Sequence, residues 1–232
     1  MHEKEISKID ALILKEIHPA VKAIKEIKGK HLRPILYLET CRSLSRRPDY
    51  QKAAGLEMIH QASLLHDDII DAAPLRRLTQ TIAVKHGPMT SLLYGDYIYL
   101  KAVQILGPNA LHICQWMVEG ELLQMNKSKD TLLVARLKTG SLFGLAMQMA
   151  GKTKKQKETL FALGETIGLA FQLQDDLKDI KEDKKNKILT YPIVSGRDDT
   201  SKKIDALKKD ALKQMKALGI QRLANVLNRI IV

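Results

Sequence analysis

Several features that define other protein classes are scarce in this chain. Phe, Trp and Tyr together make up 4% of 232 residues, and there are two cysteines, Cys41 and Cys114. Both cysteines lie in apolar helical contexts without the spacing of metal ligands, which favours small core residues over a disulfide. No apolar run reaches the roughly 18 residues that span a bilayer. The polar start lacks a signal-peptide core, so we expect a cytoplasmic protein.

Acidic residues are also in the minority, because the net charge is +12 and the isoelectric point is about 9.6. Such a balance suits nucleic acid, an anionic membrane surface or phosphorylated substrates. The lysines gather in segments such as 152–157, 181–187 and 202–216, most of which we expect to be solvated helix faces and loops. No aromatic-rich strand or nucleic-acid motif accompanies them. The sequence therefore favours a phosphorylated small molecule, and we expect no nucleic-acid partner.

The composition favours helices, because Leu, Ile, Ala and Lys dominate and apolar residues recur near the helical period. With 45% hydrophobic and 28% charged residues, the chain is long enough for one large domain with a full core. We find no linker or internal repeat, and therefore expect residues 1–232 to form a single domain. The predicted helices cover 6–25, 34–45, 50–72, 89–106, 109–125, 131–150, 155–180, 190–194 and 201 onward. Residues 75–86 are predicted to be irregular or a short helix. Residues 181–186 and 196–200 are predicted to be loops.

Two copies of one acidic motif, Asp-Asp-x-x-Asp, carry the chemistry. Each lies in or at the end of an apolar helical segment, and residues four apart on a helix share a face. Carboxylates at the ends of buried helices repel one another unless a cation compensates them. Hard oxygen ligands that leave room for water and phosphate suit Mg²⁺. A single motif on a charged surface is usually solvated, but two in apolar surroundings predict a metal-bridged diphosphate site formed by Asp67, Asp68, Asp71, Asp175, Asp176 and Asp179.

Basic and polar residues flank both motifs at positions that suit phosphate. Lys30 and Arg33 surround a predicted helix start, where free N–H groups and the helix dipole favour anions. Arg76 and Arg77 follow the first motif, and arginine forks match diphosphate oxygens, although an Arg pair after a helix is usually a solvated turn. His60 lies two turns before Asp67, and its non-functional alternative is a packed core residue. Lys138 and Thr139 offer a cation and a hydroxyl, although the lysine could simply extend to water. Gln172 and Lys187 lie on either side of the second motif.

Taken together, these residues resemble the trans-isoprenyl diphosphate synthases, also called polyprenyl synthetases. The segments His60–Asp71 with Arg76-Arg77, and Phe171–Asp179, are similar to the two aspartate-rich motifs of that family. Further matching pieces occur in the order of the family: Gly29-Lys30-x-x-Arg33-Pro34, Gly95-Asp96, Gly120-Glu121, Lys138-Thr139-Gly140 and Lys187-x-x-Thr190-x-Pro192. The resemblance covers about residues 25–195.

The resemblance implies an all-α fold, in which antiparallel helices surround a central cavity and the acidic motifs face each other across its mouth, as a homodimer. It implies that the six aspartates hold Mg²⁺, about three ions per active site, on an allylic diphosphate. In this scheme Arg76, Lys138, Thr139 and Lys187 steady that diphosphate, with Lys138 also catalytic. Lys30, Arg33, His60 and Arg77 bind isopentenyl diphosphate, and Gln172 is a further substrate-binding residue. Transient contact with a membrane surface during product release is also expected.

The chain departs from the family pattern in several places. Leu78 follows the arginine pair, where the family commonly has glycine, and Asn186-Lys187 stands in place of a longer loop. The chain is shorter than usual, with expected trims near 107–130 and at the C-terminus. Ala62 and Ser63 before Asp67 are small, and Ile59 lies about a turn earlier. This compact motif resembles that of long-chain synthases, so we expect a product of C30 or longer, with C20 or C15 as alternatives.

Three other classes are weighed against this interpretation. A terpene cyclase or head-to-head prenyltransferase also uses acidic helices with Mg²⁺, but would not need Lys30, Arg33 and Arg77. A non-catalytic partner subunit of a heteromeric synthase would typically have damaged acidic motifs, and both are intact here. A basic helical nucleic-acid binder would use the lysines but leaves the aspartates unexplained, and the salt dependence of DNA binding would distinguish it.

Overall fold

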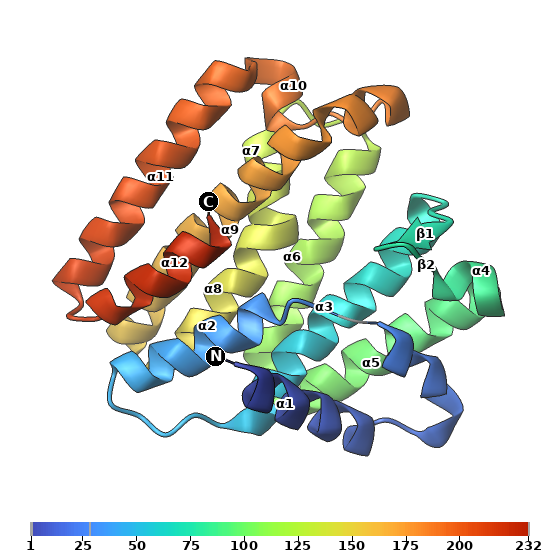
Figure 1. Ribbon diagram of the computed structural model, residues 1–232, viewed down its shortest axis with the longest axis horizontal. Coiled ribbons are helices and arrows are strands. Elements are labelled where there is room, and N and C mark those ends of the chain that lie inside the picture. Colours follow the sequence, from blue (N-terminus) through green and yellow to red (C-terminus); the bar gives the residue numbers. More distant parts are fainter. Residues whose placement is uncertain (1, 28, 232) are drawn as a thin grey trace. The chain divides into compact units, whose positions relative to one another are not determined.

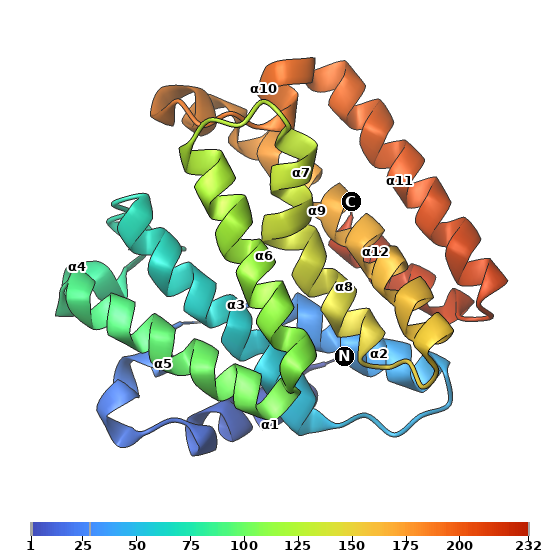
Figure 2. The ribbon, with the colours of Figure 1, turned by 180° about the vertical axis from the view of Figure 1, so that it is seen from behind.

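Helices account for almost every regular element of the protein. The computed structural model describes residues 2–27 and 29–231, and within them only one two-residue strand pair interrupts the helices (Figures 1 and 2). The all-α prediction is therefore confirmed. The chain divides into two compact units, which we describe separately: unit 1 comprises Met1–Ile35 and Asp49–Leu111, and unit 2 comprises Leu36–Pro48 and His112–Val232. A single domain remains a prediction.

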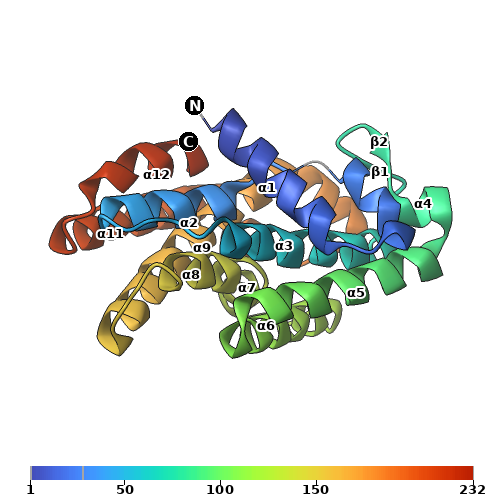
Figure 3. The ribbon, with the colours of Figure 1, turned by 90° about the horizontal axis from the view of Figure 1, so that it is seen from below.

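In unit 1 the central helix is α3 (Tyr50–Ile70), with α1 (Glu3–Glu16) on one side and α5 (Pro88–Leu106) on the other (Figure 3). Asp49 caps the start of α3 by accepting from two backbone N–H groups. The Ser91 hydroxyl at the start of α5 donates to the Leu65 carbonyl of α3 over 3.0 Å. These contacts hold the helix that carries the first acidic motif from both faces.

A tight hairpin follows α3. Strands β1 (Leu75–Arg76) and β2 (Thr79–Gln80) pair antiparallel and precede α4 (Ile82–His86). Both turn residues have positive φ, +50° at Arg77 and +66° at Leu78. Such a pair defines the type I′ turn, which matches the twist of two-residue hairpins. The turn explains why glycine suits the position of Leu78, whose side chain is 96% exposed.

Unit 2 is organised around the longest helix, α9 (Lys154–Asn186). Helix α8 (Ser141–Gln148) packs antiparallel to it, and α11 (Arg197–Ala217) also packs on α9 (Figure 1). Glycines set the α8–α9 separation, because a Cβ at Gly164 would overlap the Phe143 carbonyl oxygen. The other elements are α6 (Pro108–Met125), which begins in unit 1, α7 (Thr131–Ala135), the π-helix η2 (Arg136–Gly140), α10 (Tyr191–Ser195), η3 (Gln221–Leu223), α12 (Ala224–Ile230) and α2 (Leu32–Ser43), which also begins in unit 1.

Several predicted boundaries are wrong. Residues 6–25 are not one helix: α1 ends at Glu16, and Pro19 opens a separate 3₁₀ segment, η1 (Pro19–Glu26), since proline cannot continue the earlier helix. The predicted loop 181–186 is helical and extends α9, because nothing in that charged stretch breaks a helix. Residues 197–200 are the first turn of α11 rather than a loop. The helix predicted at 131–150 is interrupted by η2.

Two expectations about the chemical setting can be compared with the structure. Cys41 is buried, as expected of a small core residue, whereas Cys114 is only half-buried. Throughout residues 2–27 and 29–231, the helices are either too short or too polar to cross a membrane.

Candidate active site

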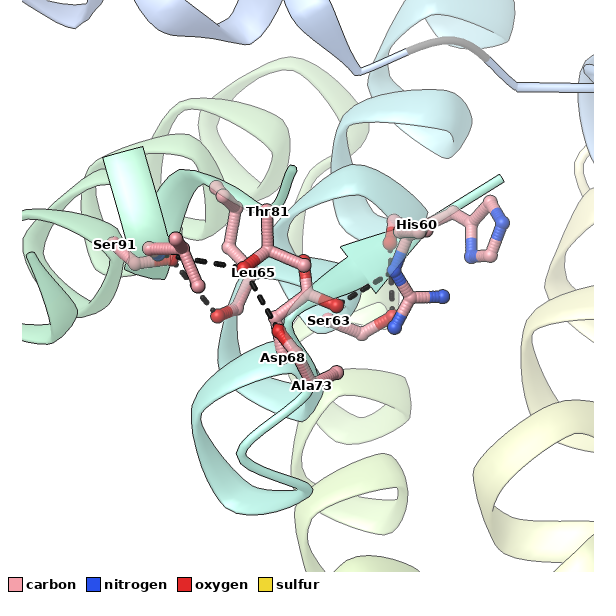
Figure 4. Close-up of polar contacts among 9 residues, drawn as sticks. His60, Ser63, Leu65, Asp68, Ala73, Thr81 and Ser91 are labelled. Carbon is pink, nitrogen blue, oxygen red and sulfur yellow. Dashed lines mark hydrogen bonds and ion pairs between the residues drawn. The ribbon is translucent and has the colours of Figure 1, made fainter. Parts of the chain in front are cut away.

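The first acidic motif lies at the C-terminal end of α3. Asp67 is half-buried, and Asp71 caps the helix end, exposed, with its N–H bonded to the Asp67 carbonyl. Asp68 is 5% exposed and accepts from Arg76 Nε over 2.7 Å. Burial raises the pKa of the Asp68 carboxyl, and the Arg76 guanidinium opposes that shift. Figure 4 shows Asp68 with this contact and with the hydrogen bond from Thr81 to the Ala73 carbonyl that closes the hairpin. The hairpin thereby positions Arg76 against the motif.

The cations predicted to bind isopentenyl diphosphate belong to unit 1. Lys30 is exposed and precedes α2, Arg33 lies in the first turn of α2 and is 8% exposed, and Arg77 is exposed in the hairpin turn. His60 is half-buried on α3 (Figure 4). Its pKa is lowered well below the ordinary range, first by burial and then by Arg33, Arg76 and Arg77. The three arginines are therefore close enough to disfavour a charged imidazole, and His60 is neutral near pH 7.

The second acidic motif lies along α9, well before its end. Asp176 is 8% exposed, whereas Asp175 is half-buried and Asp179 is exposed, one turn later. Lys178 Nζ lies 2.9 Å from Asp175 Oδ1. Burial raises the pKa of Asp176 to about 7, against a hydrogen bond from Gln172. Burial, Asp175 and Glu182 likewise raise the pKa of Asp179. The concentration of negative charge on this helix is the situation that a bound cation relieves.

A chain of hydrogen bonds joins the second motif to η2. Thr139 Oγ1 donates to Gln172 Oε1 over 2.6 Å, and Gln172 Nε2 donates to Asp176 Oδ1 over 2.7 Å. Lys138 ion-pairs with Glu121 of α6 and donates to Gln124 Oε1 over 2.9 Å. Lys138 and Thr139 occupy the π-helical turn, a distortion that often occurs at functional sites. Hydrogen bonds in unit 2 thus join Thr139, Gln172 and Asp176, while Lys138 is joined to α6; the role of these residues in a site stays a prediction.

Lys187 is placed differently from these residues. It is the exposed left-handed C-cap of α9, with φ of +56°, and its backbone N–H bonds back to the last turn. One turn earlier, Asp183 accepts from Thr190 Oγ1 over 3.2 Å and contributes to the raised pKa of Asp176. We did not predict a role for Asp183. Its spacing of seven residues from Asp176, two helical turns, is the signal that could have indicated it.

The three chain-length candidates lie on α3. Ile59 and Ala62 are completely buried, while Ser63 is half-buried and its hydroxyl donates to the His60 carbonyl over 2.9 Å (Figure 4). Their role stays a prediction.

The donors in both motifs suit Mg²⁺. They are carboxylate oxygens, and among residues 2–27 and 29–231 no three His, Cys, Asp or Glu side chains converge into a ready-made metal cage. Mg²⁺ usually takes one or two carboxylates and completes its octahedron with water and substrate phosphate. Two carboxylates one helical turn apart in each motif fit that preference better than they fit a metal held by protein alone.

One buried acid was missed altogether. Glu57 on α3 is 0% exposed, and neither of its carboxylate oxygens has a hydrogen-bond partner among the described residues. His31 Nε2 lies 3.9 Å from Glu57 Oε1, and it also lies 2.8 Å from Asp10 Oδ1. A lone acid inside the apolar run Ala-Ala-Gly-Leu-Glu-Met-Ile was the signal in the sequence.

Comparison with known proteins gives consistent results. The model of the polyprenyl synthetase family matches residues 14–228. Octaprenyl diphosphate synthase of Escherichia coli (strain K12) is 31% identical over 208 residues, covering 78% of this chain and 64% of that protein. Nonaprenyl diphosphate synthase of Mycobacterium tuberculosis is 33% identical over 174 residues, covering 66% and 52%. The chain thus spans less than two thirds of the length of these curated relatives.

The fold is likewise found in solved structures. A geranylgeranyl pyrophosphate synthetase from the archaeon Geoglobus acetivorans aligns with a TM-score of 0.84 and 24% identity, covering 99% of this chain and 97% of that one. A decaprenyl diphosphate synthase from Rhodobacter capsulatus aligns with a TM-score of 0.80 and 24% identity, covering 100% and 98%. At this identity the likeness shows the fold.

Proposed function

Because this chain belongs to the polyprenyl synthetase family, we propose that it is a prenyltransferase that condenses isopentenyl diphosphate with an allylic diphosphate, head to tail and in trans. One observation carries the proposal. In each unit the middle aspartate of the motif is buried and held by a neighbouring side chain, Asp68 by Arg76 and Asp176 by Gln172. Of the outer aspartates, Asp67 and Asp175 are only half-buried, and Asp71 and Asp179 are exposed, so a metal and a diphosphate can reach them.

Each group of residues has a distinct task in this reaction. Asp67, Asp71, Asp175 and Asp179, with Asp68 and Asp176, would hold Mg²⁺, which supplies Lewis-acid neutralisation of the departing diphosphate. Arg76 and Lys138 donate to the allylic diphosphate oxygens, as do Thr139 and Lys187. Lys30, Arg33, Arg77 and neutral His60 orient isopentenyl diphosphate. The scarcity of aromatic residues leaves aliphatic side chains to exclude water from the carbocation.

The test is incubation with isopentenyl diphosphate, farnesyl diphosphate and Mg²⁺, followed by chromatography of the products. Asp67→Ala and Asp175→Ala should each lower turnover by orders of magnitude while the helical circular-dichroism signal stays unchanged. Asp205→Ala, which removes an exposed carboxylate from α11, is the matched control and should retain activity. Full turnover in excess chelator, or in both motif variants, would refute the proposal.

The product is proposed to be C30 or longer. The support is the compact first motif preceded by the small residues Ala62 and Ser63, and the octaprenyl and nonaprenyl synthases among the relatives. Since Ala62 is completely buried, Ala62→Phe combines chain shortening with overpacking of about 1–3 kcal/mol. Ser63→Phe, at a half-buried position, is the cleaner probe and should shift products toward C15–C20. A wild-type product of C15, or no shift in either variant, contradicts this part of the proposal.

The active form is proposed to be a homodimer. Helix α5 exposes Met89, Leu93 and Leu100, which are 66%, 63% and 68% exposed, although they are large apolar side chains. Helix α6 exposes a second stripe, Val118, Leu122 and Met125, at helical spacing. Contiguous apolar faces of this kind typically pack against a partner. Leu93→Lys should produce monomers in sedimentation analysis. The control Leu212→Lys, on α11, should not. An unchanged sedimentation coefficient in Leu93→Lys would argue against α5 as part of the dimer interface.

A further inference from the structure

Glu57 is placed where a carboxylate is costly. It is completely buried on α3, and both its oxygens are without hydrogen bonds among the described residues. An unsatisfied buried polar group destabilises a fold, and a charged one does so more strongly. Burial accordingly raises the pKa of Glu57, while His31, Arg33 and Arg77 act in the opposite direction. The residue therefore needs an explanation other than its contribution to folding.

Among the described residues, His31 has a ring nitrogen within ion-pair distance of Glu57, and its side chain is 4% exposed. Its Nδ1 lies 3.1 Å from the Gly29 carbonyl oxygen and its Nε2 lies 2.8 Å from Asp10 Oδ1. The His31 ring therefore links the backbone just before α2 to a carboxylate on α1. Glu57 Oε1, 3.9 Å from His31 Nε2, is the second carboxylate oxygen beside this ring.

The backbone around His31 is strained in a way that these contacts explain. His31 has φ of +51°, a left-handed conformation that is unfavourable for a residue other than glycine. Such a conformation persists only where its surroundings impose it. The surroundings of His31 impose its conformation, because the neighbouring backbone lies directly against the buried Glu57 carboxylate. A Cβ at Gly29 would overlap Glu57 Oε1. The His31 carbonyl then accepts from Ile35 N over 3.0 Å and starts α2.

The strained residue lies between the two cations assigned to isopentenyl diphosphate, Lys30 and Arg33. We infer that Glu57 is a positioning residue of the diphosphate site: it anchors His31, and through His31 it holds residues 29–33 in the conformation that presents Lys30 and Arg33 to isopentenyl diphosphate. The inference rests on the proposed function for the identity of the ligand. It assigns Glu57 no contact with the substrate, and Asp10 shares the anchoring role from α1.

The first experiment measures steady-state kinetics of Glu57→Gln, which keeps the shape of the side chain and removes its charge. The apparent KM for isopentenyl diphosphate should rise about 5- to 30-fold, the factor that one or two kcal/mol represents. The kcat and the KM for the allylic substrate should stay within about twofold, the pattern of lost ground-state binding. Glu39→Gln, which removes an ion pair with Arg42 further along α2, is the matched control and should leave all constants unchanged.

The second experiment separates positioning from a merely structural role. His31→Asn removes the ring, while asparagine tolerates the left-handed backbone. If Glu57 acts through His31, adding Glu57→Gln to His31→Asn should change the KM for isopentenyl diphosphate by less than about twofold. The melting temperature of Glu57→Gln should be no lower than that of wild type. Three results would each overturn the inference. The first is an unchanged KM in Glu57→Gln, and the second is a full effect of Glu57→Gln on the KM in the His31→Asn background. The third is a fall in the melting temperature of Glu57→Gln that matches its loss of binding.

A binding measurement distinguishes failure of this inference from failure of the proposed function. Calorimetric titration with isopentenyl diphosphate in excess chelator reports the affinity without metal and without turnover. Wild type should bind, and Glu57→Gln should bind about 5- to 30-fold more weakly. If wild type shows no turnover yet this difference appears, the proposed reaction is wrong and the positioning role stands. If both proteins bind equally, or neither binds, the positioning role is wrong.

Discussion

The separation between α8 and α9 can be tested by adding one methyl group, in the variant Gly164→Ala. A Cβ at Gly164 would overlap the Phe143 carbonyl oxygen and lie 2.9 Å from the Gly144 Cα. Both atoms belong to the backbone of α8, so no change of rotamer can make room. The helices must move apart, and overpacking of this kind costs about 1–3 kcal/mol.

Helix propensity acts in the opposite direction, because alanine is favoured over glycine in a helix interior by about 1 kcal/mol. Since the clash is with rigid backbone, we take the upper part of the overpacking range. The net loss is then about 1–2 kcal/mol, which lowers the melting temperature of a chain of this size by about 2–8 °C. Ala162→Gly, at an exposed position on the same helix, measures the propensity effect alone.

The same displacement should affect the site, because the α8–α9 hairpin and the adjoining η2 hold Thr139 Oγ1 2.6 Å from Gln172 Oε1. Separation of the helices lengthens this hydrogen bond and releases Gln172 from its position beside Asp176. Thermal unfolding by circular dichroism and the KM for the allylic substrate are the two measurements. A melting temperature equal to or above that of wild type would mean that the helices adjust freely and that the glycine contact does not set their spacing.

Three further changes give distinct outcomes. Folding raises the pKa of Glu57, so its proton is bound more tightly in the folded than in the unfolded chain, and wild-type stability falls as pH rises above about 4.5. The melting temperature of Glu57→Gln relative to wild type should therefore increase as pH rises above that value. A difference that stays constant with pH would contradict the burial effect. Lys138→Met removes a charged hydrogen-bond donor and should raise the KM for the allylic substrate roughly 10- to 150-fold. The control Lys154→Met changes a side chain that is 93% exposed and should leave this KM unchanged. Equal KM values in the two variants would show that Lys138 is not part of the site. Leu78→Gly removes the strain of a left-handed leucine, about 1–2 kcal/mol, but increases the conformational entropy lost on folding by about 0.5–1 kcal/mol. The melting temperature should therefore rise by about 1–2 °C. A fall would show that the exposed leucine side chain stabilises the fold.

Much of the architecture followed from local rules. Helical periodicity, the Pro88 start of α5 and glycines after α5 and α10 act over a few residues, so most helices were predicted with their boundaries close to those observed. The errors occurred where local signals were balanced. The charged stretch 181–186 could be a loop or a helix end, and its continuation in α9 depends on the packing of the preceding turns.

The site divides in the same way. The two acidic motifs, the arginine pair and the Lys-Thr-Gly segment are each contiguous in sequence, so residue type and spacing were enough to propose them as site candidates. Partners distant in sequence were out of reach of such patterns. The contact of Arg76 with Asp68 requires the hairpin, and that of Thr139 with Gln172 requires the α8–α9 approach.

Glu57 shows the limit most clearly. In the sequence it is one acid in an apolar run, and its hydrogen-bonding state and burial are properties of the folded chain. Its neighbour His31 is anchored by Asp10, from a helix whose distance along the chain gives no hint of proximity. A sequence specifies which charges exist, but the free energy of each charge depends on the atoms that replace water around it, and folding brings those atoms from distant segments.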